Sequence, residues 1–316
     1  MSDTLAGIFA ATLQTACVLV LAPVVVGVTR QVRARMEGRS GAGVWQPLRD
    51  LRKLFRKRPL TADGVILGRA VPVALVATSV LLVALLPLVT MVTIPAVPAD
   101  LFVVVSVLLV GSVLVALLGL DAGTAFGGMG SSRHMMVAAL VEPTVLVAVY
   151  ALSIPVDAST LSTILSARMT SPASIVSPVS ALALVALLIA VVAETGRLPV
   201  DNPSTHLELT MIHEAMVLEA SGRDLGWVEL AAWLRLTGLI GLLVNLAVPW
   251  GVADRVAPTA LLVGIASLTV KVILGAGLLA AVEVFLAKVR LFRVPELMAG
   301  SFVLAFLAVT ASYLTV

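Results

Sequence analysis

Long apolar runs recur along the entire chain and are separated by shorter polar segments. Each run holds about 20 residues, enough for a helix that rises 1.5 Å per residue to cross the ~30 Å hydrocarbon core of a membrane. The pattern predicts eight transmembrane helices, at residues 6–28, 70–92, 101–120, 135–155, 175–193, 228–250, 259–287 and 297–316. The predicted fold class is therefore all-α, a polytopic integral membrane protein that forms a single membrane domain over residues 1–316.

The composition also indicates a lipid environment. Of the 316 residues, 60% are hydrophobic and only 12% are charged, and the mean hydropathy is +1.11, whereas soluble domains keep about a quarter of their residues charged. The net charge of +3 does not indicate a nucleic-acid partner, because the basic residues lie beside predicted membrane ends. A single cysteine, Cys17, cannot supply the thiolates of an iron–sulfur cluster. No metal or cofactor is expected in this chain, and electron transfer is expected on partner subunits.

The distribution of lysine and arginine predicts the orientation in the membrane. Four polar segments, at 30–69, 121–134, 194–227 and 288–296, lie on one side of the predicted membrane and hold 17 of the 21 basic residues. Two basic residues lie on the other side and two lie inside spans. Because basic loops stay in the cytoplasm, the four segments are expected to be cytoplasmic loops, with both termini outside a bacterial-type cytoplasmic (inner) membrane. Within the second loop, the glycine-rich run 127–130 is expected to form a flexible turn.

The first of these loops contains an amphipathic helical pattern. Apolar residues recur at helical spacing between Val44 and Phe55, and basic residues fill much of the remaining surface. The basic residues of this pattern are Arg49, Arg52, Lys53, Arg56 and Lys57. Such a helix either lies on the membrane surface with a solvated basic face or forms a docking surface for a cytoplasmic partner, and the sequence leaves both interpretations open.

Five charged residues lie inside predicted spans or at their ends: Glu142, Glu194, Arg235, Lys271 and Glu283. Charged groups are costly in lipid, so they are candidates for function. Lys271 and Glu283 are twelve residues apart, which on a straight helix separates them by about 18 Å and ~120°. They cannot pair directly, and Arg235 or Glu142 is expected to supply a partner. Each residue alone is explained by a buried ion pair that fixes packing, whereas the set favours a proton relay.

The loop 194–222 is unusually polar for this chain. Its prolines favour an extended stretch, and Ser204 or Thr205 is placed to cap a helix that Gly222 would end.

On this predicted helix His206 and His213 share one face, and Glu208 and Glu219 share another. A zinc site of the His-Glu-x-x-His type is excluded, because Val217 occupies the position of the second histidine.

Four segments resemble the complex I subunit 1 family. The run at 193–222, AETGRLPVDNPSTHLELTMIHEAMVLEASG, resembles the family's loop between the fifth and sixth spans. It is closer to the hydrogenase branch, the membrane subunit of formate hydrogenlyase and hydrogenase 4, than to the quinone-reducing branch. Further matches are RQVRARMEGRSGAGVWQPLRDLRKLFRK at 30–57, GLDAGTAFGGMGSSRHMMVAALVEP at 119–143 and VRLFRVPELMAGSF at 289–302. They follow in family order with family spacing, so the resemblance covers nearly the whole chain.

The resemblance implies an eight-helix subunit that anchors a hydrophilic redox arm to an ion-pumping membrane arm. The complex would be an energy-converting oxidoreductase of the group 4 [NiFe]-hydrogenase or formate hydrogenlyase type. Its [NiFe] centre and Fe-S clusters would belong to hydrogenase-like large and small subunits, and its other membrane partners would be antiporter-like subunits. The matched motifs place a proton path on Glu142, Glu194, Asp201, Glu208, Glu214, Glu219, Lys271 and Glu283, with Arg197 beside it. His206, His213 and Arg235 are supporting candidates.

The sequence departs from the family pattern at two places, and the second departure argues against a functional quinone site. Ala42 stands where relatives often carry proline after a glycine, and the segment 204–219 differs from the acid-rich pattern of quinone-using relatives. The nearest alternative is the quinone-site subunit of a NADH- or ferredoxin-quinone oxidoreductase. Further alternatives are a stand-alone secondary ion transporter, which the buried charges favour, and a passive scaffold in which those charges only fix packing.

Overall fold

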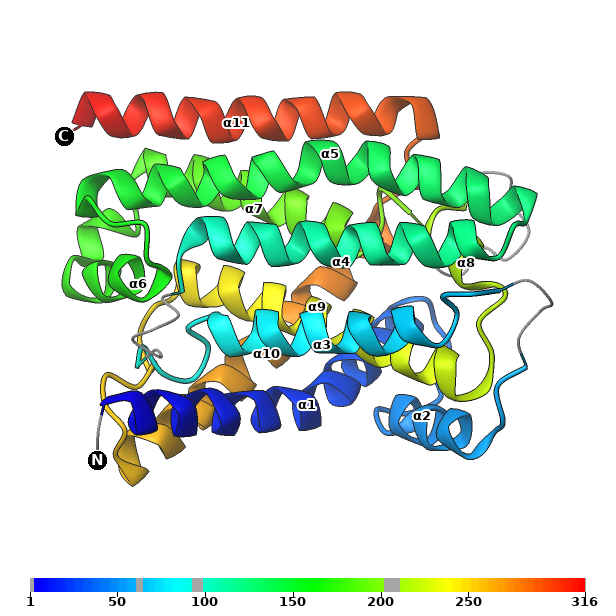
Figure 1. Cartoon of the computed structure of the whole chain (residues 1–316). Helices are drawn as coiled ribbons and strands as arrows, with labels where there is room; N and C mark the ends of the chain where they lie inside the picture. The colour runs from blue at the N-terminus through cyan, green and yellow to red at the C-terminus, as the bar shows by residue number, and fades with distance from the viewer. Residues whose placement is uncertain (1–2, 61–64, 93–98, 202–210, 316) are drawn as a thin grey trace.

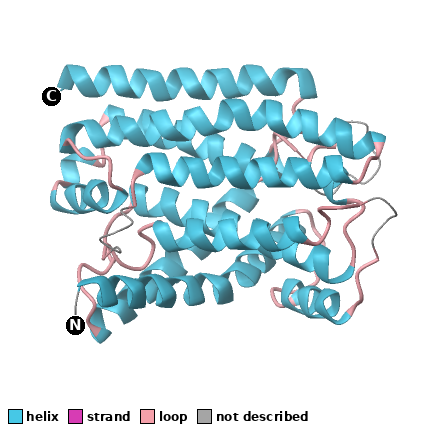
Figure 2. Ribbon diagram, in the orientation of Figure 1, coloured by secondary structure: helices cyan, strands magenta, loops and turns pink. Residues whose placement is uncertain are grey.

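The chain folds into a bundle of helices that lie along one common direction (Figure 1), as seen in a computed structural model. The structure describes all residues except 1–2, 61–64, 93–98, 202–210 and 316. The α-helices in the described part are α1 (Asp3–Met36), α2 (Gln46–Arg56), α3 (Ala70–Leu85), α4 (Leu101–Asp121), α5 (Ala125–Ser153), α6 (Leu161–Thr170), α7 (Pro178–Glu194), α8 (His213–Val217), α9 (Gly222–Ala247), α10 (Pro258–Phe285) and α11 (Val294–Thr315). Three short 3-10 helices are η1 (Ile154–Val156), η2 (Pro172–Ser174) and η3 (Leu291–Arg293). Figure 2 shows helices and loops alone in this part of the chain.

Six helices, α1, α4, α5, α9, α10 and α11, are long and apolar enough to cross a membrane. The shorter apolar helices α3 and α7 complete the eight spans that the hydropathy pattern predicts. The predicted fold class, an all-α multi-pass membrane protein, is confirmed. Both termini lie at one end of the bundle and α2 and α8 lie at the other (Figure 1), as an even number of crossings requires. We refer to these as the terminal end and the α2 end.

Two helices organise the packing. α5 packs against α4, α7 and α11, while α9 packs against α1, α2, α3, α7 and α10. The outer face of α10 stays apolar: Leu262, Leu274, Leu278 and Phe285 are each 67–81% exposed. A row of exposed large apolar side chains suits a surface that faces lipid rather than water.

The second span is shorter than predicted, because α3 ends at Leu85 rather than continuing to residue 92. Leu86 adopts an extended conformation before Pro87, which disfavours helix in the residue that precedes it. The backbone groups released there bond to the buried side chain of Gln14 in α1. Its Nε2 donates to the carbonyls of Val83 and Leu86, both at 2.7 Å. Its Oε1 accepts from the N–H groups of Leu88 at 3.1 Å and Val89 at 2.9 Å.

The predicted loop 121–134 is mostly helical, because α5 begins ten residues before the predicted span. Thr124 caps the helix by accepting a hydrogen bond from the N–H of Gly127 at 3.1 Å. The expectation of a flexible turn at the glycines is wrong. A Cβ at Gly127 would lie 2.2 Å from the carbonyl oxygen of Gly119, so this glycine permits close packing of α5 against α4.

The prediction of a helix from residue 204 to residue 222 is also wrong for the described residues. Only α8, five residues long, is helical before α9. Gly222 begins α9 instead of ending a helix, with a φ of +54° that favours glycine. Of the residues predicted to share helix faces, His206 and Glu208 lie outside the described residues, and Glu219 follows the end of α8.

The predicted connection between the fourth and fifth spans contains a further helix, α6, at the terminal end (Figure 1). Its Arg168 is buried. The guanidinium Nε donates to the carbonyl of Leu246 at 2.9 Å, and Nη2 donates to Ser180 Oγ at 2.6 Å. A cation at the carboxyl end of α9 is favoured by the helix dipole, so this buried charge has a structural role.

Candidate functional site

A buried ion pair joins α7 to α9 inside the bundle. Glu194, the last residue of α7, pairs with Arg235 of α9, and their side chains are 2% and 12% exposed. Arg235 Nη2 also donates to Ser112 Oγ at 3.0 Å and to the carbonyl of Leu108. The structure thus places two charged residues from separate predicted spans in direct contact, with two residues of α4 beside them.

Glu142 of α5 belongs to the same cluster. It is 6% exposed and interacts with Ser112, Glu194 and Arg235. Its Oε1 has no hydrogen-bond partner among the described residues. Two carboxylates here share one guanidinium, so the cluster keeps a net negative charge unless one carboxylate binds a proton. We refer to Glu142, Glu194 and Arg235 as the carboxylate cluster.

A small cavity of about 70 Å³ borders the carboxylate cluster. Its wall includes Glu194 and Arg235, and also His134, His213 and Thr195. Cavities of this size with polar walls have room for water. His134 was not among the residues that the sequence singled out, because it falls in the segment predicted to be a loop. Because α5 begins at residue 125, His134 lies on the same helix as Glu142, about two turns before it. This helical spacing is the sequence signal that could have identified His134.

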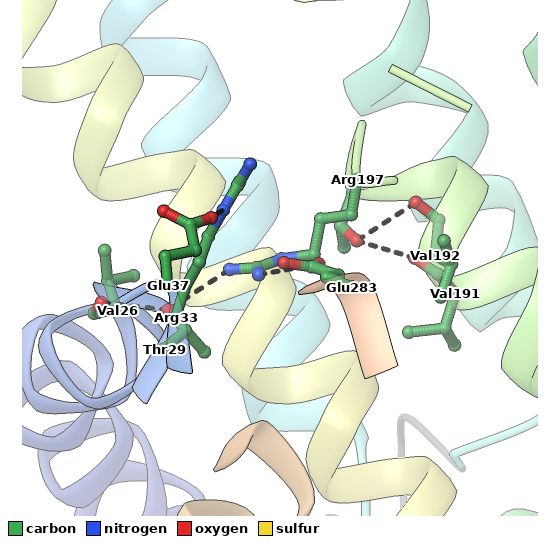
Figure 3. Close-up of polar contacts among 9 residues, drawn as sticks. Val26, Thr29, Arg33, Glu37, Val191, Val192, Arg197 and Glu283 are labelled. Atoms are coloured by element: carbon green, nitrogen blue, oxygen red, sulfur yellow. Dashed lines mark hydrogen bonds and ion pairs between the residues drawn. The ribbon is translucent and has the colours of Figure 1, made fainter. Parts of the chain in front are cut away.

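A second cavity, of about 860 Å³, lies at the α2 end. Arg197, just after α7, donates to Glu283 of α10 at 3.0 Å and lies 3.5 Å from Thr29 Oγ1 of α1 (Figure 3). All three residues line this cavity.

The same close-up shows Arg33 beside Glu37 near this pair (Figure 3). Hydrogen bonds from Arg33 and Arg39 lower the pKa of the Glu37 carboxyl, so it stays ionised close to the cavity. Arg30, Arg33 and Arg39 line the wall as well, which makes this part of the cavity basic.

The two cavities share a wall formed by Thr195, His213 and Ala232. His213 is held there through its backbone. The carboxylate of Asp201 accepts hydrogen bonds from the N–H groups of His213 at 3.1 Å and Ile212 at 3.2 Å. Asp201 also pairs with Lys288, after α10, at 3.2 Å. Asp201 therefore acts as an anchor for the start of α8.

The partners expected for Lys271 and Glu283 are wrong. Glu283 pairs with Arg197, not with Arg235. Lys271 instead donates to Asn245 Oδ1 at 3.2 Å and to the carbonyl of Trp250 at 2.5 Å. These acceptors belong to the last turn of α9 and the loop after it, where the helix dipole favours a cation.

The remaining candidates separate in space. Glu214 lines the larger cavity beside His213. Glu219 lines neither of the two cavities and instead borders a third, of about 20 Å³, between Leu118 and Ser221. The four basic residues of α2 and Lys57, which follows it, are all exposed. The apolar face of α2 is directed toward α9, where Phe55 packs edge-on against Trp227 with ring centroids 4.7 Å apart.

Gly111 of α4 makes room for the guanidinium of Arg235. A Cβ at this position would lie 2.9 Å from Nη1. We expect Gly111→Ala to lower the free energy of unfolding by about 1–3 kcal/mol, because the guanidinium is fixed by its carboxylate and overpacking then strains the cluster. Gly300→Ala is the matched control, since nothing lies within 4 Å of its Cβ position in α11. It should be neutral or stabilise the helix by up to ~1 kcal/mol. Thermal unfolding in detergent measures both, and equal midpoints would show that Arg235 moves freely.

Comparison with known proteins agrees with this architecture. The family model described as NADH dehydrogenase matches residues 9–314. Hydrogenase-4 component C of Escherichia coli (strain K12) is 32% identical over 301 residues, covering 93% of this chain and 92% of that protein. Formate hydrogenlyase subunit 4 of the same strain is 29% identical over 297 residues, covering 94% and 95%.

Among solved structures, the fold resembles a chain of the membrane-bound sulfane sulfur reductase, an archaeal respiratory membrane complex. The TM-score is 0.79 at 18% identity, with 96% of this chain and 99% of that chain covered. Together, the family match and the bacterial relatives show that this chain belongs to the NADH dehydrogenase (complex I subunit 1) family of membrane proteins, in its hydrogenase branch.

Proposed function

We propose that this chain is the membrane-anchoring and proton-coupling subunit of a multisubunit energy-converting oxidoreductase. The relatives support a membrane subunit of such a complex, since they are named as components of hydrogenase 4, formate hydrogenlyase and a respiratory membrane complex. The type of complex that fits best is a group 4 [NiFe]-hydrogenase or formate hydrogenlyase, located in the bacterial cytoplasmic membrane. The chain would link a hydrophilic redox arm to an ion-pumping membrane arm.

One observation carries the proton-coupling part of this proposal. The carboxylate cluster is buried, has one guanidinium for two carboxylates, and borders a small cavity that shares a wall with a large cavity at the α2 end. A group that relays protons has to gain and lose them within the membrane and connect to water on one side. The buried cluster and the two adjoining cavities support such a path. Arg197 and Glu283 would act at the wall of the larger cavity.

We also propose the partners of this chain. We propose that the α2 end faces the cytoplasm and docks the hydrogenase-like large and small subunits. The exposed basic face of α2 is available for an acidic protein surface, because its apolar face packs on α9 of the same chain. The [NiFe] centre and the Fe-S clusters would belong to those subunits, since this chain has a single cysteine. Antiporter-like subunits would pack against the bundle within the bilayer.

The larger cavity favours a second candidate function. At about 860 Å³ it is of a size that accommodates a small organic molecule, and it lies beside the Arg197–Glu283 pair. A chain that binds quinone there would serve a quinone-reducing complex. Photolabelling of the assembled complex with an azidoquinone separates the two, because labelling at residues 29–42 would support the quinone function and labelling elsewhere alone would not.

The test of the proton-coupling function is Glu142→Gln, which keeps the size of the side chain and removes its ability to ionise. We expect ion translocation per assembled complex to fall by about a hundredfold or more, as for loss of a proton-transfer group. Dye-linked activity of the hydrophilic arm should persist. The measurement is charge movement in vesicles at a matched amount of complex.

Glu296→Gln is the control, because Glu296 is an exposed carboxylate in the first turn of α11 and lies outside the cluster. Its translocation should equal that of the unmodified protein. Normal translocation in Glu142→Gln and Glu194→Gln would remove the relay and favour a passive scaffold, in which only assembly or thermal stability changes.

A further inference from the structure

We propose that His134 and His213 form a two-histidine proton step between the large cavity at the α2 end and the carboxylate cluster. His213 would exchange protons with water in the larger cavity, and His134 would pass them to Glu194 or Glu142. The inference deepens the proposed function and rests on it, since it names the groups by which protons reach the cluster.

The positions of the two imidazoles carry the inference. His213 lies on the wall that the two cavities share, so one side chain borders both. His134 borders only the smaller cavity, together with Glu194 and Arg235. A proton that leaves the larger cavity therefore meets His213 first, then a space with room for water, and then His134 beside the cluster.

The bonding of His134 indicates a role beyond packing. Buried imidazole nitrogens normally have a hydrogen-bond partner in the protein or in ordered water. Nε2 of His134 is buried and has no such partner among the described residues. The ring interacts with the backbone of Ser112, the residue whose hydroxyl accepts a hydrogen bond from Arg235. His134 is thus attached to the cluster on one side and keeps a nitrogen available for a proton.

The start of α8, which carries His213, is held from two sides. Asp201 binds the backbone N–H groups at the start of α8, and Arg133 of α5 donates to the carbonyl of Met211 at 3.2 Å. Arg133 adjoins His134 in the sequence, so the contact with residue 211 ties the two histidine-bearing segments together. An imidazole fixed in this way keeps its distance to the next group, as proton transfer along a chain requires.

Charged groups of the carboxylate cluster and His213 surround His134. Arg235 on α9 faces His134 and repels a positive charge on its imidazole, while Glu142 on α5 and Glu194 on α7 supply the carboxylates of the neighbouring cluster. A charge on His213 also opposes a charge on His134. In the proposed step, a proton that reaches His134 Nε2 from His213 is passed on to a carboxylate of the cluster. The step breaks one N–H bond and forms one O–H bond, and the imidazole returns to its neutral form.

The experiment compares ionisable and non-ionisable replacements in the assembled complex. His134→Gln keeps hydrogen-bonding groups but cannot carry a proton, so ion translocation should fall by about a hundredfold or more. His134→Glu restores a group that can carry a proton and should recover translocation, with a changed pH profile. His213→Gln, at the rim of the larger cavity, should slow translocation in the same way.

A purely structural His134 gives a different outcome. It predicts that the charged replacement harms assembly more than His134→Gln, with translocation per assembled complex unchanged in both. Normal translocation in His134→Gln and His213→Gln, with loss in Glu142→Gln, would overturn the histidine step and leave the proposed function intact. Normal translocation in all of these variants, together with Glu194→Gln, would remove the proposed function itself.

Discussion

Replacing Arg235 with leucine is expected to lower the free energy of unfolding by about 3–5 kcal/mol, the usual penalty for removing one partner of a buried ion pair. The reason is that Glu194 is 2% exposed and has Arg235 as its cation. Ser112 and the carbonyl of Leu108 lose the same donor. Thermal or denaturant unfolding of the purified chain in detergent measures the change.

A double-mutant cycle separates the lost pairing from lost packing. Glu194→Gln with Arg235→Gln removes both charges and leaves groups that can hydrogen-bond to one another, so it should be less destabilising than the sum of Glu194→Gln and Arg235→Gln alone. Arg255→Leu is a suitable control, because Arg255 lies at the surface, where its contact with Asp254 spans 4.0 Å and both side chains are more than 70% exposed. If Arg235→Leu unfolds at the same midpoint as Arg255→Leu, the Glu194–Arg235 contact contributes nothing to stability.

The number of spans could be predicted from hydropathy, because each apolar run is long enough to cross the hydrocarbon core of a membrane. The helix ends could not be predicted from the same signal. α5 starts at residue 125 because Thr124 caps it and Gly127 fits against α4, and both effects depend on tertiary contacts. Similarly, α3 ends where Pro87 and the amide of Gln14 meet, which links residues more than 70 positions apart.

The candidate site was only partly predictable for the same reason. Glu142, Glu194 and Arg235 could be found because charged residues are rare inside apolar runs. Their pairing could not, since it depends on how α5, α7 and α9 are rotated against one another. Glu283 therefore pairs with Arg197 instead of Arg235. His134 was missed because its segment had the composition of a loop, and an uncharged imidazole near an arginine carries little signal in sequence alone.

Gln14 was missed for a similar reason, because a hydropathy pattern does not distinguish a single uncharged amide within an apolar helix. In the structure it is 2% exposed and satisfies four backbone groups at the break after α3. An unsatisfied buried donor costs about 1–3 kcal/mol. Gln14→Leu, which keeps the size but removes the amide, is therefore expected to lower the free energy of unfolding by about 2–6 kcal/mol from the N–H groups of Leu88 and Val89 alone.

Two measurements test the role of Gln14. The midpoint of thermal unfolding in detergent should fall in Gln14→Leu, and amide hydrogen exchange should rise at residues 88 and 89 before other parts of the bundle change. Thr12→Val is the matched control, because Thr12 lies two residues away on the exposed side of α1 and its hydroxyl bonds to carbonyls of its own helix. Asn245 stabilises the same break after α3, because its amide donates to the carbonyl of Leu88 at 2.9 Å. Asn245→Leu combined with Gln14→Leu should therefore lower the free energy of unfolding by more than the sum of the two single changes. Unchanged exchange at residues 88 and 89 in Gln14→Leu would show that other groups satisfy the break, and that its position follows from Pro87 alone.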